Sequence, residues 1–126
     1  MMLDHVSLLV RSLDKTEKFY TEVLGFEPIY NGTHQPHIRW YGIGGLAALH
    51  VTEGDFGKTH LEKQTHFALS ATDFDATLAR FRRDGVAFSG MGGTPGGVNT
   101  RPDGMRAIFL RDPNGYWFEI NDFKHR

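Results

Sequence analysis

The stretch Ile108-Phe-Leu-Arg-Asp-Pro-Asn-Gly-Tyr-Trp-Phe-Glu-Ile-Asn121 predicts two strands joined by a tight turn. Pro113 presets φ at the second position of the turn, and Gly115 accepts a left-handed conformation at the fourth. The apolar and aromatic residues on either side are typical of strands. Because side chains alternate along a strand, Phe118 faces the core while Glu119 lies on the opposite face. A carboxylate on so apolar a strand needs water or a charged partner.

Length and composition narrow the class of protein. The 126 residues indicate one domain with a real core. The net charge of −1 and the lack of a basic stripe argue against nucleic acid as a partner. No apolar run approaches the length of a membrane span and no signal peptide precedes the first strand, so we expect no membrane partner and a cytoplasmic location. The absence of cysteine excludes disulfides, thiolate ligands and a cysteine nucleophile, and it suits the cytosol.

The first half of the chain predicts a strand, a helix and three more strands. Residues 3–10 alternate as a strand, with Val6, Leu8 and Val10 on one face. Ser12 can cap the helix that follows, and Gly25 can end it. Three short strands are expected next, at Phe26–Tyr30, about His37–Gly42 and Leu46–Thr52.

The second half repeats this order after a polar linker at residues 53–63. A strand is expected at Thr65–Ala71, and Asp73 can cap a second helix that ends at Gly85. Three further strands are expected at Val86–Ser89, Met105–Arg111 and Tyr116–Asn121. The sequence therefore predicts a single α+β domain over residues 1–126, built from a βαβββ module at about 1–52 and another at about 64–122.

The stretch Gly90–Gly104 holds six glycines and two prolines. It is long for a loop inside a compact domain. Such a loop is either a functional lid or a flexible connection, and the sequence leaves both open.

Four polar residues take matching places in the two modules. His5 and His66 each lie seven residues before the residue that caps the following helix. His50 and Glu119 each lie on the last strand of their module. All four have the parity that points away from the helices. Two such modules can join into one curved mixed sheet, and the four residues would then face the cup that it encloses.

Three of these residues can form a metal site. His5, His66 and Glu119 offer two imidazoles and one carboxylate from three strands. That set forms a facial triad for Zn(II), Ni(II), Mn(II) or Fe(II) and leaves positions open for water or substrate. Strands hold such ligands more precisely than loops do.

The sequence resembles the vicinal oxygen chelate superfamily, which includes glyoxalase I, fosfomycin-resistance thiol transferases, extradiol dioxygenases and bleomycin-resistance proteins. The resemblance covers nearly the whole chain and rests on five stretches: Leu3-Asp-His-Val-Ser-Leu-Leu-Val10, Phe19-Tyr-Thr-Glu-Val-Leu-Gly-Phe26, Leu49-His-Val51, Thr65-His-Phe-Ala-Leu-Ser70 and Asp112-Pro-Asn-Gly-Tyr-Trp-Phe-Glu119. It implies paired βαβββ modules around a metal-binding cup, often completed across a homodimer. The metal positions of the family match His5, His66 and Glu119 one by one.

The sequence departs from the pattern of the family at His50. At the matching position bacterial glyoxalase I has a glutamate that ligates the metal and moves the proton. His50 can therefore be a fourth ligand, a general base or a polar wall of the pocket. Because the glutamate is missing, isomerisation of methylglyoxal itself is not implied. The fosfomycin enzymes bind a phosphonate with cationic groups, so Arg39 and Arg101 are candidates for an anion clamp. The alternative is that both are solvated surface arginines.

These observations together predict a divalent-metal enzyme acting on a small oxygenated substrate. The metal would bind two vicinal oxygens and stabilise an enediolate or alkoxide while His50, with Glu119 in the site, moves a proton. A glyoxalase-like isomerase or lyase, or a thiol transferase using a thiol such as glutathione, is preferred. The alternatives are an extradiol-type Fe(II) dioxygenase and a non-catalytic drug-binding protein. Exposed sheet edges and the resemblance both predict a homodimer.

Overall fold

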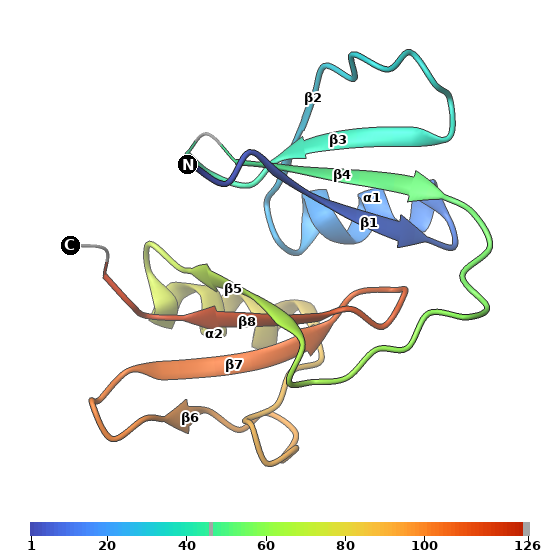
Figure 1. The fold of residues 1–126 in the computed structure, drawn as a ribbon. Coiled ribbons are helices and arrows are strands. Elements are labelled where there is room, and N and C mark those ends of the chain that lie inside the picture. The colour runs from blue at the N-terminus through green and yellow to red at the C-terminus, as the bar shows by residue number, and fades with distance from the viewer. Residues whose placement is uncertain (46, 125–126) are drawn as a thin grey trace. The chain divides into compact units, whose positions relative to one another are not determined.

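The computed structural model describes residues 1–45 and 47–124, and the chain divides into two compact units, unit 1 at residues 1–60 and unit 2 from residue 61 onward. Each unit runs strand, helix and three strands (Figure 1). The predicted α+β class and the repeated βαβββ order are therefore confirmed. Within the described ranges, no helix has the length and apolar character that crossing a membrane requires.

Unit 1 is a four-stranded mixed sheet with one helix. Its elements are β1 (His5–Val10), α1 (Leu13–Glu22), β2 (Glu27–Ile29), β3 (Ile38–Gly42) and β4 (Ala48–Glu53). The strand order is β1-β4-β3-β2, with β1 parallel to β4 and the other pairs antiparallel. Tyr20, Tyr41 and Val51 are fully buried in its core. The predicted start of the last strand at Leu46 lies outside the described residues.

Unit 2 repeats this topology. Its elements are β5 (His66–Ser70), α2 (Phe74–Asp84), β6 (Asn99–Thr100), β7 (Arg106–Arg111) and β8 (Trp117–Asn121). The strand order is β5-β8-β7-β6, and β5 is parallel to β8. Phe81 of α2 is buried with Phe118 and Ile108 of the sheet. The helix-facing sides of the strands are therefore the ones that the alternation predicts.

Both predicted helix caps are present. The Ser12 hydroxyl accepts a hydrogen bond from the backbone N–H of Lys15 at 3.3 Å. The Asp73 carboxylate accepts one from the N–H of Ala76 at 2.9 Å. α2 ends at Gly85, whose φ of 69° is in the left-handed region that glycine enters without steric cost.

The predicted strand at Val86–Ser89 is wrong. Only Ser89 pairs there, as an isolated bridge to Pro95 and Phe109. The physical reason is that the backbone of the glycine-rich loop turns back on this segment, because the Gly96 N–H donates to the Phe88 carbonyl at 2.8 Å. The same loop contains β6, which pairs with β7.

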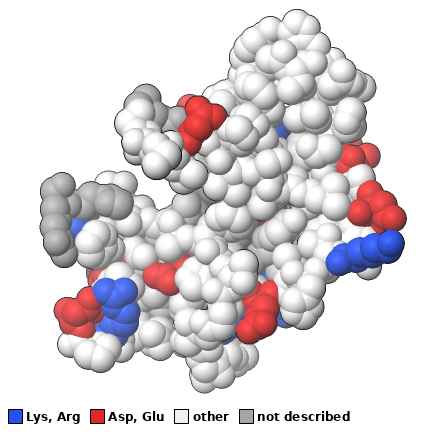
Figure 2. Space-filling view, in the orientation of Figure 1, with Lys and Arg blue, Asp and Glu red and all other residues white. Residues whose placement is uncertain are grey.

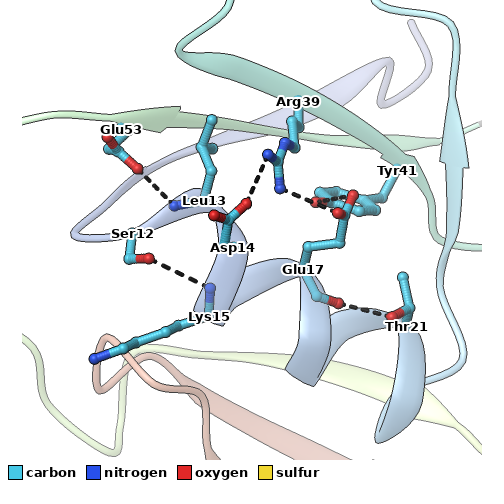
Figure 3. Close-up of polar contacts among 9 residues, drawn as sticks. All are labelled: Ser12, Leu13, Asp14, Lys15, Glu17, Thr21, Arg39, Tyr41 and Glu53. Atoms are coloured by element: carbon cyan, nitrogen blue, oxygen red, sulfur yellow. Dashed lines mark hydrogen bonds and ion pairs between the residues drawn. The ribbon is translucent and has the colours of Figure 1, made fainter.

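An arginine in each unit ties the sheet to its helix. Arg39 of β3 meets Asp14 at 2.8 Å and Glu17 at 3.0 Å, both on α1 (Figure 3). Glu17 also accepts a hydrogen bond from the Tyr41 hydroxyl, whose pKa is raised mainly by burial. Arg39 is therefore committed to the helix side of its sheet, where two carboxylates already pair with it, and this disfavours the anion clamp among the two alternatives.

The counterpart of this arginine in unit 2 is Arg106 of β7. Its guanidinium meets Asp75 of α2 at 2.8 Å and Asp122 at 2.9 Å. More widely, the face drawn in Figure 2 carries acidic and basic side chains in small separate groups. That mixture agrees with the net charge of −1.

Candidate functional site

His66 and Glu119 meet on the face of unit 2 that points away from α2. β5 and β8 are parallel neighbours, and the register places Trp117 beside His66 and Glu119 one pleat further along. The two side chains converge diagonally, with His66 Nε2 at 3.2 Å from Glu119 Oε2. The exposed fractions are 21% for His66 and 13% for Glu119, so the pair is reachable but largely shielded.

The second polar atom of each member already has a partner. His66 Nδ1 faces the backbone carbonyl of Lys63 at 2.9 Å, so this nitrogen carries a proton and donates it. Glu119 Oε1 accepts a hydrogen bond from the Asn121 side-chain amide at 2.8 Å. In a neutral His66 the Nε2 lone pair therefore faces a carboxylate oxygen. These two acceptors need a proton or a metal cation between them, and hydrogen bonds of this kind orient metal ligands.

His5 of unit 1 is oriented in a similar way. Its Nδ1 donates to the Asp4 carboxylate at 2.6 Å, which leaves the Nε2 lone pair available. Its side chain is 42% exposed. An imidazole held by a carboxylate through one nitrogen can ligate a metal through the other.

His50 is the middle ring of a stack of three. Its ring lies 4.1 Å from that of His5 and 3.9 Å from that of Trp40, with interplanar angles of 12° and 3°. The Trp40 Nε1 atom is buried without a partner among the described residues, so stacking and not a hydrogen bond places the indole. Both faces of the His50 ring are covered, and its edges alone remain for chemistry.

Burial lowers the pKa of His50, and the nearby His5 lowers it further, while Asp4 acts in the opposite direction. His50 is therefore neutral near pH 7. Within the described part of the chain its ring nitrogens make no hydrogen bond. A neutral, immobilised imidazole can accept a proton or ligate a metal.

The four predicted site residues thus form two pairs, His5 with His50 in unit 1 and His66 with Glu119 in unit 2. No cluster of three or more His, Cys, Asp or Glu side chains fit to hold a metal occurs within residues 1–45 and 47–124. The three-ligand set remains a prediction.

The other predicted candidates have local partners. Arg101 pairs with Asp103 inside the glycine-rich loop. His34 bonds the Tyr30 hydroxyl at 2.6 Å, and His37 and His60 are exposed. The sequence predicts no role for these histidines or for His125, which lies outside the described residues.

Sequence reasoning did not single out the residues that orient the pairs. Asp4 adjoins His5, and Asn121 has the same strand parity as Glu119, so both could have been found from position alone. Trp40 could have been found only from the pairing of β3 with β4. Lys63 acts on His66 through its carbonyl, for which no sequence signal exists.

Comparison with known proteins places this geometry in context. Residues 2–120 match the family described as the Glyoxalase/Bleomycin resistance protein/Dioxygenase superfamily. A "Probable lactoylglutathione lyase" of Vibrio parahaemolyticus is 29% identical over an alignment of 124 residues, and the match covers 92% of this chain and 86% of that protein. The fosfomycin resistance protein FosX of Listeria monocytogenes is 27% identical over 127 residues, covering 94% of this chain and 87% of its own.

Solved structures show the same fold. The oxidase ChaP-H2 superposes with a TM-score of 0.78 at 22% identity, over 99% of this chain and 95% of its own. FosX of Listeria monocytogenes gives a TM-score of 0.72 at 22% identity, over 96% of this chain and 92% of its own.

Proposed function

Because the chain belongs to the Glyoxalase/Bleomycin resistance protein/Dioxygenase superfamily, we propose that it is a divalent-metal-dependent enzyme of the glyoxalase type. Its substrate is a small oxygenated molecule that chelates the metal. The reaction is an isomerisation or lyase step, or the transfer of a thiol such as glutathione. The names of the lyase and fosfomycin-resistance relatives support this choice of reactions.

The facing atoms of His66 and Glu119 carry the proposal. An imidazole nitrogen and a carboxylate oxygen 3.2 Å apart, each with its other polar atom already bonded, suit a shared cation. Imidazole and carboxylate together fit Zn(II), Ni(II), Mn(II) or Fe(II). His5 is the third ligand of the proposed set, because its Nε2 is left available by the bond to Asp4.

In the proposed mechanism a bound divalent cation would supply Lewis-acid polarisation of two substrate oxygens. His66, Glu119 and His5 would hold it. His50 takes a proton from the carbon or hydroxyl beside those oxygens and returns it later in the reaction, since its ring is neutral and fixed by stacking. Lys63 and Asn121 keep the tautomer of His66 and the orientation of Glu119 constant during this transfer.

The proposed assembly is a homodimer. All three residues of the edge strand β2 are exposed, and Ile29 there is 43% exposed. Pairing of two copies would cover such an edge. Light scattering should give twice the mass of the chain, and a monomer mass at micromolar concentration would contradict the dimer.

Calorimetric titration of the metal-free protein with Ni(II), Zn(II), Mn(II) and Fe(II) tests the metal site. We expect one cation per chain. His66→Ala should lower the affinity by on the order of 100-fold or more, because one of three ligands is lost. His37→Ala is the matched control, since it removes an exposed imidazole without a role, and its affinity should equal that of the wild type.

The outcomes separate the alternatives. Unchanged affinity in His66→Ala removes this residue from the site. If none of these cations binds to the wild type, the result favours a non-catalytic small-molecule binder over a metalloenzyme. If a cation does bind, the metal-loaded enzyme is screened with α-ketoaldehydes and thiols, with fosfomycin and with catechols. Turnover of catechols alone, with Fe(II), would make it an extradiol-type dioxygenase.

A further inference from the structure

Arg111, Trp117 and His66 form one row across unit 2. The register pairs Arg111 of β7 with Trp117 of β8, and Trp117 with His66 of β5. Arg111 also has the same strand parity as Phe109, whose ring lies edge-on to that of His66. The arginine therefore belongs to the same face of the sheet as the His66–Glu119 pair.

The guanidinium of Arg111 lies 4.8 Å from the centre of the Trp117 ring. Among the described residues its side chain has no carboxylate partner and no hydrogen bond. In this it differs from Arg39, Arg101 and Arg106, which each face at least one carboxylate. Stacking occupies the face of a guanidinium and leaves the N–H groups at its edge free to bind an oxyanion.

A second cation lies at the same ring. The Lys63 ammonium is 5.0 Å from the centre of Trp117 and 5.1 Å from that of Phe109. It donates to the carbonyls of Gly90 and Met91 at 2.8 and 2.9 Å, which uses two of its three donors. Within the described ranges no carboxylate pairs with Lys63 either. Two uncompensated cations at one indole raise the local positive potential and attract an anion.

We propose that Arg111, supported by Lys63, forms an anion subsite on Trp117, and that the substrate of the His66–Glu119 site carries a carboxylate or phosphonate. Two strand spacings separate Arg111 from His66, about 10 Å between their backbones. Trp117 lies between them in the strand register, on the same face of the sheet, so a small molecule lying across this residue can bridge the two groups. The metal half of this statement rests on the proposed function, whereas the anion half rests on Arg111 alone.

Two hydroxamates test the substrate class in the Ni(II)-loaded protein. Acetohydroxamate chelates through two vicinal oxygens and has no further charge, and succinyl monohydroxamate adds a distal carboxylate. By calorimetry we expect the second to bind about tenfold tighter to the wild type, as for a charge-assisted contact. Arg111→Gln should abolish this preference and leave the affinity for Ni(II) unchanged. Arg83→Gln, which removes the same charge from α2, should keep it.

A metal-free arm keeps the two proposals distinguishable. In a Trp40→Phe background Trp117 is the only tryptophan, and inorganic phosphate should change its fluorescence saturably at low salt. Arg111→Gln in that background should remove the response. Equal affinities of the two hydroxamates, or an unaltered preference in Arg111→Gln, would overturn the subsite. If Ni(II) does not bind, the proposed metal function fails and the phosphate titration alone decides on the subsite. Loss of the fluorescence response in Arg111→Gln supports the subsite, and persistence of the response in that variant contradicts it.

Discussion

Units 1 and 2 have the same topology and carry different chemistry at the same places. In each unit the first strand is parallel to the fourth. The histidine that begins the first strand converges with a residue of the fourth strand, two positions beyond its own register partner. In unit 1 the two residues are His5 and His50, whose rings stack. In unit 2 they are His66 and Glu119, whose polar atoms face each other. The repeat therefore fixes where the pair lies, and the fourth-strand residue decides what the pair can do.

The aromatic residue opposite each pair follows the same logic. Trp40 lies opposite His50, and Phe109 lies opposite Glu119. Trp40 lies flat on the imidazole and completes a stack that fixes the ring, while burial lowers the pKa of His50 and favours its neutral form. The ring of Phe109 lies at 85° to that of His66, and the Nε2 atom of His66 faces Glu119. In the proposed function unit 1 therefore moves the proton through His50 and adds one metal ligand, His5, while unit 2 supplies the other two ligands.

Replacing His50 should give the largest effect on this division of roles. His50→Gln keeps size and hydrogen-bonding capacity and removes the titratable nitrogen. We expect turnover to fall by about 10²–10⁴-fold, as for a lost general base, with little change in melting temperature. Steady-state kinetics with the substrate found in the screen, together with thermal unfolding, give both values.

The metal affinity of the same variant sharpens the result. An unchanged affinity with slow turnover assigns His50 to proton transfer, while a lower affinity makes it a fourth ligand. A change in KM alone would make it a wall of the pocket. Full turnover with unaltered metal binding would contradict both active roles and would leave the contrast between the units without functional meaning.

The helix caps should give a smaller contrast. Asp73→Ala should cost about 1 kcal/mol of unfolding free energy, because it removes an acceptor at 2.9 Å and a negative charge at a helix N-terminus. Ser12→Ala should cost less, since the Ser12 bond is longer at 3.3 Å and Glu53 independently accepts from the N–H of Leu13 at 2.8 Å (Figure 3). Urea unfolding measures both.

A matched variant checks the cause of this difference. Asp73→Asn keeps the acceptor and removes the charge, so it should recover most of the loss if the hydrogen bond dominates. Glu53→Ala, which removes the second acceptor at this helix start, should make unit 1 more sensitive to Ser12→Ala. Equal losses for the two caps in the wild-type background would contradict the supporting role of Glu53.

The sequence predicted the features that local rules govern. Alternation assigned His50 and Glu119 to the faces away from the helices, and capping chemistry located both helix starts at Ser12 and Asp73. The repeat made these assignments consistent, since each rule gave the same answer twice. Features that depend only on neighbours in the chain are predictable in this way.

Features that depend on distant partners were missed. Arg39 could be any surface arginine until α1 supplies two carboxylates, and Ser89 loses its strand because a loop folds back beside it. The proposed role of Arg111 depends on Trp117 beside it and on the lack of a carboxylate partner among the residues that the structure describes. None of these follows from periodicity, because each is decided by packing between elements.

The smallest expected effect comes from replacing the arginine that ties each sheet to its helix, Arg39 in unit 1 and Arg106 in unit 2. Arg106 holds the pKa values of Asp75 and Asp122 below their ordinary value of 3.8, chiefly by hydrogen bonding. Carboxyls whose pKa is lowered in the folded state stabilise it above the ordinary value, and this contribution is lost as the pH falls through the lowered pKa. Arg106→Gln should therefore lower stability slightly at pH 7, because these pairs are exposed and screened.

The stability difference between the wild type and Arg106→Gln should then shrink below about pH 4. Urea unfolding between pH 7 and pH 2 measures it, with Arg83→Gln as a control for charge. Arg106 also lies 4.9 Å from the centre of the Phe74 ring on α2. A difference that stayed constant down to pH 2 would mean that this contact, and not the carboxylates, ties the sheet of unit 2 to its helix. Arg39 has no such ring contact in the described part of unit 1. In that case Arg39→Gln should lower the free energy of unfolding less than Arg106→Gln does.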